Sequence, residues 1–287
     1  MKKQVTIKDI AREAGVSVAT VSYVINDRTD MRISEQTRKK VLQIINLFGY
    51  TPNQSAQSLA TARSRFIALA LTPGISPLHD AEQMYFTDVF SSFLQEHNYN
   101  IIYMNSSCRQ RFDRADAIVC YDLSEADFLE MGDENFVPLL AIDCMIEDPF
   151  PIFFKVNTDY PKLYEYAQSQ LGTEFTLCTL TTANLKKKKM LESIFPDIAY
   201  ISSYKDLMPF LHEAEAAKQA PDKATSAKPL LVIHHTLAAM LDGYPGLLYV
   251  PQTGRAKFDI LMNAMELAIG REQVDCHDLL APLQTEA

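Results

Sequence analysis

Apolar residues recur at helical spacing three times near the start of the chain, and each series predicts a short helix. The first series runs through residues 7–14, where Thr6 is placed to cap the helix and Gly15 to end it. The second covers Ser17 to Ile25, and the third begins near Ser34 and stops at Gly49. The apolar positions are, in chain order, Ile7, Ile10, Ala11 and Ala14; Val21, Val24 and Ile25; and Val41, Ile44, Ile45 and Phe48.

These three helices, the first two joined by a tight turn, predict a helix-turn-helix. In a DNA-binding example the second helix enters the major groove with its N-terminus first. Small side chains at Val18 and Ala19 let that end approach base edges. Short hydrogen-bonding side chains suited to phosphate oxygens stand at Ser17, Thr20, Ser22 and Asn26. The alternative is any small three-helix domain, which the spacing alone favours equally.

The segment after Gly49 predicts either a plain linker or a marginal helix. Pro52 disfavours helix at Thr51, and Asn53 can cap a helix that runs to Arg63. Its apolar strip is narrow and consists of Ala56, Leu59 and Ala60. Such a short helix forms in water only when it pairs with a copy of itself or lies on a partner.

From residue 65 onward, short apolar runs of strand length alternate with helical segments. Strands are predicted at residues 66–71, 101–104, 116–120, 138–143, 175–180, 230–234 and 247–250, and helices near 81–96, 160–170 and 255–269. Alternation of this kind gives parallel sheets covered by helices. The sequence therefore predicts an all-α head followed by an α/β body.

Charge separates the same two parts of the chain. Residues 1–65 hold five Lys and six Arg against three Asp and two Glu, a net charge of +6, so a chain that carries −9 overall leaves −15 for the rest. A basic head on an acidic body is typical of a protein whose front end meets phosphates. Two ordinary domains can also differ in charge by chance.

Composition and motifs exclude several classes of protein. Apolar residues make up 47% of the chain, and the longest clear apolar run, 67–71, is far shorter than the ~18 residues of a membrane span. Five scattered cysteines without a CxxC pair predict reduced thiols in a cytoplasm. His234 and His235 have no second histidine at helical spacing and no nearby carboxylate cluster, so a structural or surface role is favoured. Since no metalloprotease, hydrolase or phosphate-loop motif occurs, we expect no metal, no cofactor and no catalysis.

The stretches TIKDIAREAGVSVATVSYVIN and ISEQTRKKVLQIINLFGYTPNQSAQSLATARS resemble the LacI family of bacterial transcription repressors. The resemblance implies a homodimer that holds two heads over a pseudo-palindromic double-stranded DNA operator, with paired hinge helices in the minor groove. Carried over by position, the base-reading residues are Val18, Ala19 and Tyr23; the phosphate contacts are Thr6, Ser17, Thr20, Ser22, Asn26 and Thr37; and the minor-groove hinge residues are Ala56 and Leu59.

Tyr23 departs from the family, in which arginine is common at this position. Arginine reads guanine through two hydrogen bonds, to O6 and N7, and tyrosine offers only one hydroxyl and a ring. We therefore expect an operator half-site that differs from the usual one.

The body resembles the family more weakly, through YNIIYMNSS, ADAIVCYDL, FVPLLAIDC and VPQTGRAKFDILMNAMELAI. The resemblance implies a shortened, two-lobed, periplasmic-binding-protein-like body with an effector cleft between the lobes. Residues 106–116 leave hardly any room for a helix that the family has there, and the family's arginine-bearing RxxGF segment has no clear counterpart. The nearby run 186–189, four lysines, predicts a solvated helix face. No effector-binding residue is assigned, so a sugar-like effector, an unusual ligand and no ligand all stay open.

Together these observations predict a cytoplasmic, homodimeric, sequence-specific DNA-binding regulator that represses by occupying an operator. The expected domains are a helix-turn-helix at 1–50, a hinge helix or linker at 51–64, and an effector-binding-like dimerisation domain at 65–287. The alternative is a small-molecule sensor with a vestigial DNA-binding head. An enzyme and a membrane partner are disfavoured because no reactive cluster and no apolar span support them.

Overall fold

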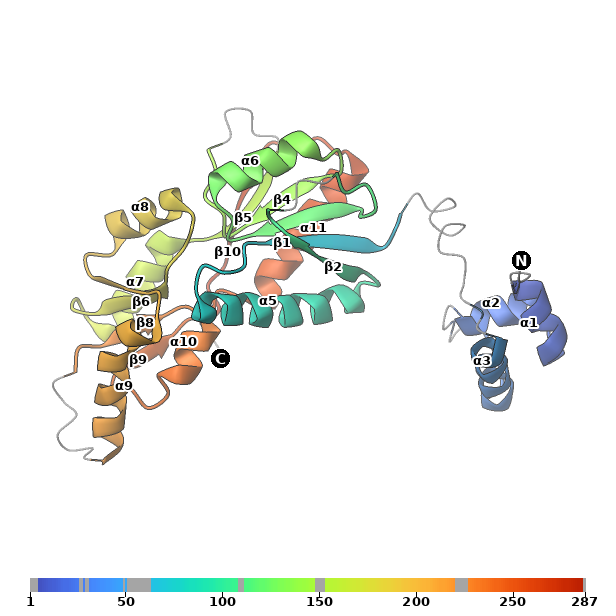
Figure 1. Ribbon diagram of the computed structural model, residues 1–287, viewed down its shortest axis with the longest axis horizontal. Coiled ribbons are helices and arrows are strands. Elements are labelled where there is room, and N and C mark those ends of the chain that lie inside the picture. The colour runs from blue at the N-terminus through green and yellow to red at the C-terminus, as the bar shows by residue number, and fades with distance from the viewer. Residues whose placement is uncertain are drawn as a thin grey trace. The chain divides into compact units, whose positions relative to one another are not determined.

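The computed structural model describes residues 5–25, 28, 31–48, 50, 63–107, 111–147, 153–219 and 227–285. The chain divides into two compact units, residues 1–63 and 64–287 (Figure 1). The first is the helical head, and the second is the α/β body.

The described part of the head holds α1 (Ile7–Ala14), α2 (Val18–Ile25) and α3 (Glu35–Phe48). Gly15 follows α1 with a φ of +67°, a left-handed conformation that glycine adopts without steric cost, as expected for the residue that ends this helix. The buried core combines all three helices, and its members are Ile10, Ala11, Ala14, Val21, Val24 and Val41.

Phe48 is the exception among the apolar positions predicted for the head's core. Its side chain is 41% exposed, and its neighbour Leu47 is 81% exposed. The reason is length: α3 has 14 residues, whereas α1 and α2, against which it packs, have eight each. The last turn of α3 therefore contributes little to the core.

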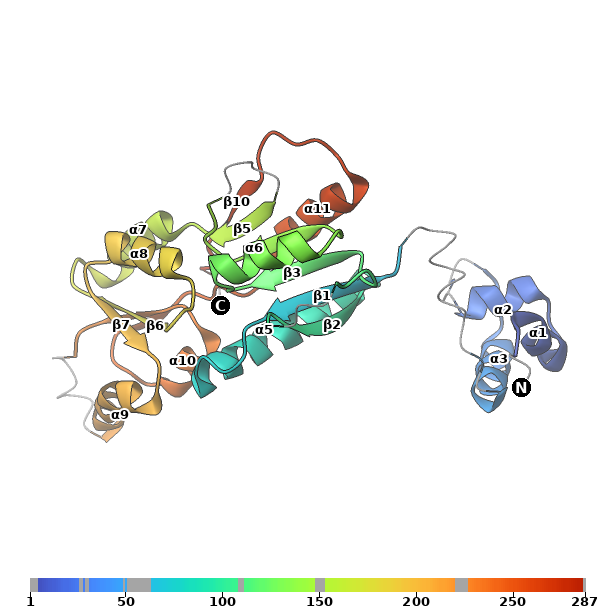
Figure 2. The same cartoon turned by 45° about the horizontal axis from the view of Figure 1, so that its top comes forward.

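The first lobe of the body is a six-stranded parallel sheet in the order β10-β5-β4-β3-β1-β2. Its strands are β1 (Phe66–Leu71), β2 (Asn100–Asn105), β3 (Ala117–Tyr121), β4 (Leu139–Ile142), β5 (Phe154–Thr158) and β10 (Asp278–Ala281). Helices α5 (Pro77–Glu96) and α11 (Arg255–Gly270) cover one face, and α6 (Glu125–Glu134) covers the other (Figure 2). Cys120 and Cys144 pack on the α6 side as small apolar residues, as predicted.

The second lobe is a four-stranded parallel sheet in the order β7-β6-β8-β9. Its strands are β6 (Thr176–Leu180), β7 (Ile198–Ile201), β8 (Leu230–Val232) and β9 (Leu247–Tyr249). Helices α7 (Tyr160–Leu171) and α8 (Leu185–Ile194) pack on one face, and α9 (Tyr204–Gln219) and α10 (His235–Met240) on the other. The chain enters this lobe after β5 and returns to the first lobe after β9.

All seven predicted strands are present, but the described residues hold three further strands that were missed: β5, β7 and β10. The sequence of β5, FKVNT, contains a lysine and an asparagine, which are rare in a buried strand. Lys155 is nevertheless buried, and its Nζ lies 2.8 Å from Asp278 Oδ1 on β10. The charge is therefore neutralised by a residue that is distant in sequence.

Candidate functional site

Helix α2 presents its predicted base-reading residues on the side opposite to the head's core. Val21 and Val24 are buried, whereas Val18 is 41% exposed and Ala19 is also exposed. Val18 and Ala19 form an exposed stripe along α2, and Tyr23 is half-buried at the edge of that stripe. Positions four apart lie on one face of a helix, so Val18 and Ala19 share a face with Ser22 and Tyr23. The structure thus places the three positions predicted to read bases on one face of α2.

Serine and threonine hydroxyls gather at the N-termini of α2 and α3. Ser17 Oγ accepts a hydrogen bond from the Thr20 N–H (3.0 Å) and lies 2.8 Å from Thr20 Oγ1. Ser34 Oγ accepts from the Thr37 N–H (3.1 Å) and lies 2.8 Å from Thr37 Oγ1. These bonds hold the hydroxyls beside helix N-termini, where exposed amides and the helix dipole favour a phosphate.

At the start of α1, Thr6 and Asp9 form a pair of hydrogen bonds. The Thr6 N–H donates to Asp9 Oδ2 at 3.0 Å, and the Thr6 hydroxyl donates to the same oxygen at 2.7 Å. These bonds, with a smaller contribution from Arg12, lower the pKa of Asp9 below its usual value. The surface of the head is otherwise rich in exposed cations: Lys8, Arg12, Arg28, Arg32, Lys39 and Lys40.

Three predicted DNA-contacting residues lie outside the described residues. They are Asn26, Ala56 and Leu59.

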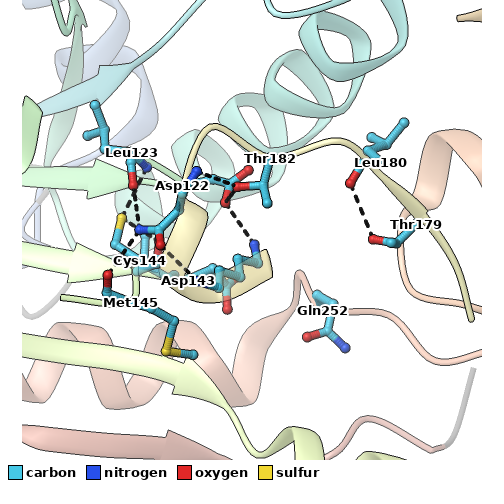
Figure 3. Close-up of polar contacts among 12 residues, drawn as sticks. Asp122, Leu123, Asp143, Cys144, Met145, Thr179, Leu180, Thr182 and Gln252 are labelled. Carbon is cyan, nitrogen blue, oxygen red and sulfur yellow. Dashed lines mark hydrogen bonds and ion pairs between the residues drawn. The ribbon is translucent and has the colours of Figure 1, made fainter. Parts of the chain in front are cut away.

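A second polar cluster lies between the two lobes of the body (Figure 3). Asp122 directly follows β3 and Asp143 directly follows β4, at the carboxyl ends of neighbouring parallel strands. Both have positive φ values, +50° and +54°, a left-handed conformation that aspartate tolerates better than most residues. Crevices at this end of parallel strands are where α/β proteins place ligands.

Asp122 is buried and uses both carboxylate oxygens. Oδ1 accepts from Lys187 Nζ (2.8 Å) and from the Thr182 hydroxyl (3.1 Å), and Oδ2 lies 3.1 Å from His79 Nε2. Burial alone would raise the pKa of Asp122, but Lys187 and His79 outweigh it and hold that pKa well below its usual range. Burial alone would lower the pKa of Lys187, and Asp122 raises it instead. The pair is therefore ionised.

The prediction that residues 186–189 form a solvated helix face is wrong for Lys187, whose exposed fraction is 6%. The physical reason is that α8 begins against the first lobe. Lys186 Nζ lies 2.8 Å from Glu125 Oε1 and 2.6 Å from Glu147 Oε2, both on the first lobe. Lys189 is exposed to solvent. Within this run, Lys186 thus pairs with the first lobe, Lys187 is buried and Lys189 is solvated.

Asn184 fixes the start of α8 to both lobes. It is fully buried, and its Oδ1 accepts from the Lys187 N–H at 2.9 Å as the helix cap. Its Nδ2 donates to the carbonyl oxygens of Leu123 (2.9 Å) and Met145 (3.1 Å) on the first lobe.

Glu82 of α5, on the first lobe, binds the N-terminus of α10 on the second lobe. Its two carboxylate oxygens accept from the N–H groups of His235 (3.1 Å) and Thr236 (2.8 Å). The Tyr85 ring stacks on the His235 ring with centroids 3.9 Å apart. The predicted structural role of the histidine pair fits this geometry, although Glu82, from far away in sequence, was missed.

A further buried ion pair lies where the chain returns to the first lobe. Lys257 Nζ of α11 donates to both oxygens of Asp143, at 2.8 and 2.9 Å, and to the Thr158 hydroxyl at 2.8 Å. Thr158 also donates to Gln252 Oε1, next to the crossing from β9 to α11. Sequence reasoning missed this pair, although an aspartate at or within two residues of the end of two consecutive predicted strands was a usable signal.

Two further features of the described residues bear on other functions. No group of three or more His, Cys, Asp or Glu side chains in these ranges is arranged to hold a metal ion. Within the same ranges no helix has both the length and the apolar character that a membrane crossing requires.

The head matches a known family. Residues 6–53 match the family model described as "Bacterial regulatory proteins, lacI family". The HTH-type transcriptional regulator RegA of Clostridium saccharobutylicum is 46% identical over 101 residues, which are 35% of this chain and 29% of that protein. The probable HTH-type transcriptional repressor ExuR of Bacillus subtilis (strain 168) is 33% identical over 153 residues, 50% of this chain and 44% of that protein. The chain thus matches less than half the length of these relatives.

Two solved structures share the fold over nearly the whole chain. The lac repressor dimer bound to operator and the anti-inducer ONPF is 18% identical with a TM-score of 0.55, covering 98% of this chain and 97% of that chain. The lac repressor bound to ONPG in the repressed state is 17% identical with a TM-score of 0.56, covering 99% of each chain. The predicted fold, a helix-turn-helix head followed by a two-lobed α/β body, is confirmed.

Proposed function

We propose that this chain belongs to the lacI family of bacterial regulatory proteins, whose family model its head matches, and that the protein is a sequence-specific DNA-binding transcription regulator. The observation that carries the proposal is the coincidence of two findings. The family match at residues 6–53 spans α1, α2 and α3, and the base-reading stripe of α2 faces away from the core.

Each predicted contact has a role in this proposal. Val18, Ala19 and Tyr23 read base edges in the major groove, where an exposed stripe with small residues allows a close approach. The hydroxyls and amide that bind phosphates belong to Thr6, Ser17, Thr20, Ser22, Asn26 and Thr37. Ala56 and Leu59, within the hinge at 51–64, enter the minor groove, and prying a base step apart there costs a few kcal/mol.

The protein acts in the cytoplasm as a homodimer that represses by occupying a pseudo-palindromic operator. Two weakly binding heads joined by the dimerising body at 65–287 gain affinity through effective concentration. The lac repressor, which shares this fold, is a dimer bound to operator in one of its structures. Repression by occupancy needs positioning alone and no catalytic step.

Selection of bound duplexes from random DNA, using the full-length protein, tests this function. We expect an enriched sequence with two-fold pseudo-symmetry. Its affinity should fall by about 10³-fold between about 50 and 200 mM salt, because several phosphate contacts release counterions. No enriched sequence, or an affinity that is flat with salt, would refute the proposal and favour a small-molecule sensor with a vestigial head.

A further inference from the structure

We propose that the two lobes of this regulator are held together by its own charged side chains, so that operator binding does not depend on a small molecule between the lobes. The interlobe lock consists of Glu82 and Asp122 on the first lobe and Asn184 and Lys187 on the second. The lock concerns the regulation of the DNA-binding function proposed above and rests on it.

The hydrogen bonds of the interlobe lock run in one direction, from the second lobe to the first. The second lobe donates through Lys187 Nζ, the Thr182 hydroxyl, Asn184 Nδ2 and two backbone amides of α10. The first lobe accepts through Asp122, Glu82 and two backbone carbonyls. Two carboxylates on the first lobe thus face one ammonium and several neutral donors on the second, and this complementarity attracts the lobes to each other.

The carboxylates of Asp122 and Glu82, which could orient a polar ligand, are already engaged within the protein. A small-molecule site uses a few convergent charged or hydrogen-bonding groups to fix its ligand. Here both carboxylate oxygens of Asp122 are already in contact with Lys187, Thr182 and His79. Both carboxylate oxygens of Glu82 accept hydrogen bonds from backbone N–H groups of α10. Figure 3 shows Asp122 and Thr182, from the two lobes, pointing toward one another.

The residues of the interlobe lock are also buried. Asp122 and Lys187 are each only 6% exposed, and Asn184 is fully buried. A ligand that took Asp122 from Lys187 would leave the ammonium buried without its carboxylate partner, which is strongly unfavourable. The Lys187 ammonium therefore occupies the position beside Asp122 that a cationic or hydrogen-bonding ligand would otherwise take.

The lock joins the lobes at two separate places. Asp122 and Asn184 connect the end of β3 to the start of α8, whereas Glu82 connects α5 to the start of α10. Tyr85 stacked on His235 adds an aromatic contact at the second place. Because two fixed points restrict rotation more than one does, loss of either should loosen both.

Hydrogen exchange of the full-length protein without DNA tests the lock. Lys187→Met removes the ammonium, and Lys189→Met, on the exposed side of the same helix, is the matched control. We expect Lys187→Met to speed exchange about tenfold or more in segments 121–125, 182–188 and 233–238, because local opening becomes more frequent. The Lys189→Met control should exchange like the wild type. Unchanged exchange in Lys187→Met would overturn the proposal.

A double variant keeps the test decisive if Lys187→Met misfolds. Asp122→Asn with Lys187→Met removes both charges, so no buried charge is left unpaired. It should retain wild-type circular dichroism and still show the faster exchange across both contact places. Wild-type exchange in a folded double variant would mean that other contacts hold the lobes.

A ligand test follows with D-glucose, D-galactose, D-xylose and cellobiose at millimolar concentration. We expect none of them to change the melting temperature of the wild type or its affinity for the selected operator. A saturable change with any of them would overturn the proposal. Failure of the DNA selection would refute the proposed function while leaving the exchange result intact, so the two failures are distinguishable.

Discussion

Replacing Lys187 by methionine should destabilise the body substantially. The Lys187 Nζ to Asp122 Oδ1 distance is 2.8 Å, and both side chains are at most 8% exposed. Removing one partner of such a buried pair typically costs about 3–5 kcal/mol, because the remaining charge stays buried. Asp122 keeps Thr182 and His79 as partners, so the low end, about 3 kcal/mol, is expected here.

This loss corresponds to a clear shift in melting temperature. For a unit the size of the body, about 1 kcal/mol lowers the melting temperature by roughly 2–4 °C, so Lys187→Met should melt about 6–12 °C lower. The chain has 13 tyrosines and no tryptophan, so tyrosine fluorescence and far-ultraviolet circular dichroism can follow the transition. Lys189→Met serves as the control and should melt like the wild type.

Two results would contradict this reasoning. A loss below about 1 kcal/mol in Lys187→Met would show that the pair behaves as a solvated surface contact. An equal loss in Lys189→Met would show that α8 responds to any substitution, whatever its charge. The double variant Asp122→Asn with Lys187→Met should recover much of the stability, because pairs removed together leave no orphaned charge.

Three further predictions concern DNA reading and pH. Tyr23→Arg should shift the selected half-site toward guanine, since arginine pairs with O6 and N7, and an unaltered selection would show that position 23 does not face the bases. Leu59→Ala should reduce DNA bending in a gel-mobility assay while the dimer stays intact, and unchanged bending would remove the hinge assignment. Burial beside Lys187 and His79, opposed by Glu82 and Asp122, lowers the pKa of His234 to about 4. As the pH falls, His234 therefore takes up a proton in the unfolded chain before it does so in the folded one. The free energy of unfolding should fall as pH drops from about 6.5 to 4, by at most ~1.4 kcal/mol per pH unit. His234→Gln should flatten that slope when the free energy of unfolding is measured by urea titration at each pH.

Signals between residues close in sequence were sufficient to predict the helices of the head. Its helices are predicted by apolar spacing, by Gly15 at a left-handed position and by Ser17 and Ser34 at helix N-termini, and the structure shows each of these features. Such signals act within one or two turns of a helix, so sequence alone can determine them. Apolar runs were likewise sufficient for seven strands of the body.

Strands and side chains that depend on distant partners were not predictable in this way. A hydropathy pattern counts a lysine as solvated, yet Lys155 lies inside the first sheet because Asp278 on β10 neutralises it. Phe48 shows the converse, since the pattern counts it as core and the short helices beside α3 leave it exposed.

The sequence by itself determined the resemblance of the head to the lacI family, the order of most elements and the charge difference between head and body. Only the tertiary structure decided that Lys187 turns inward, because its partner Asp122 stands 65 positions away, and that Glu82 meets α10 from 153 positions away. Burial of a charge is favourable only when the opposite charge is at contact distance. That distance is a property of how the two lobes pack and cannot be read from either segment alone.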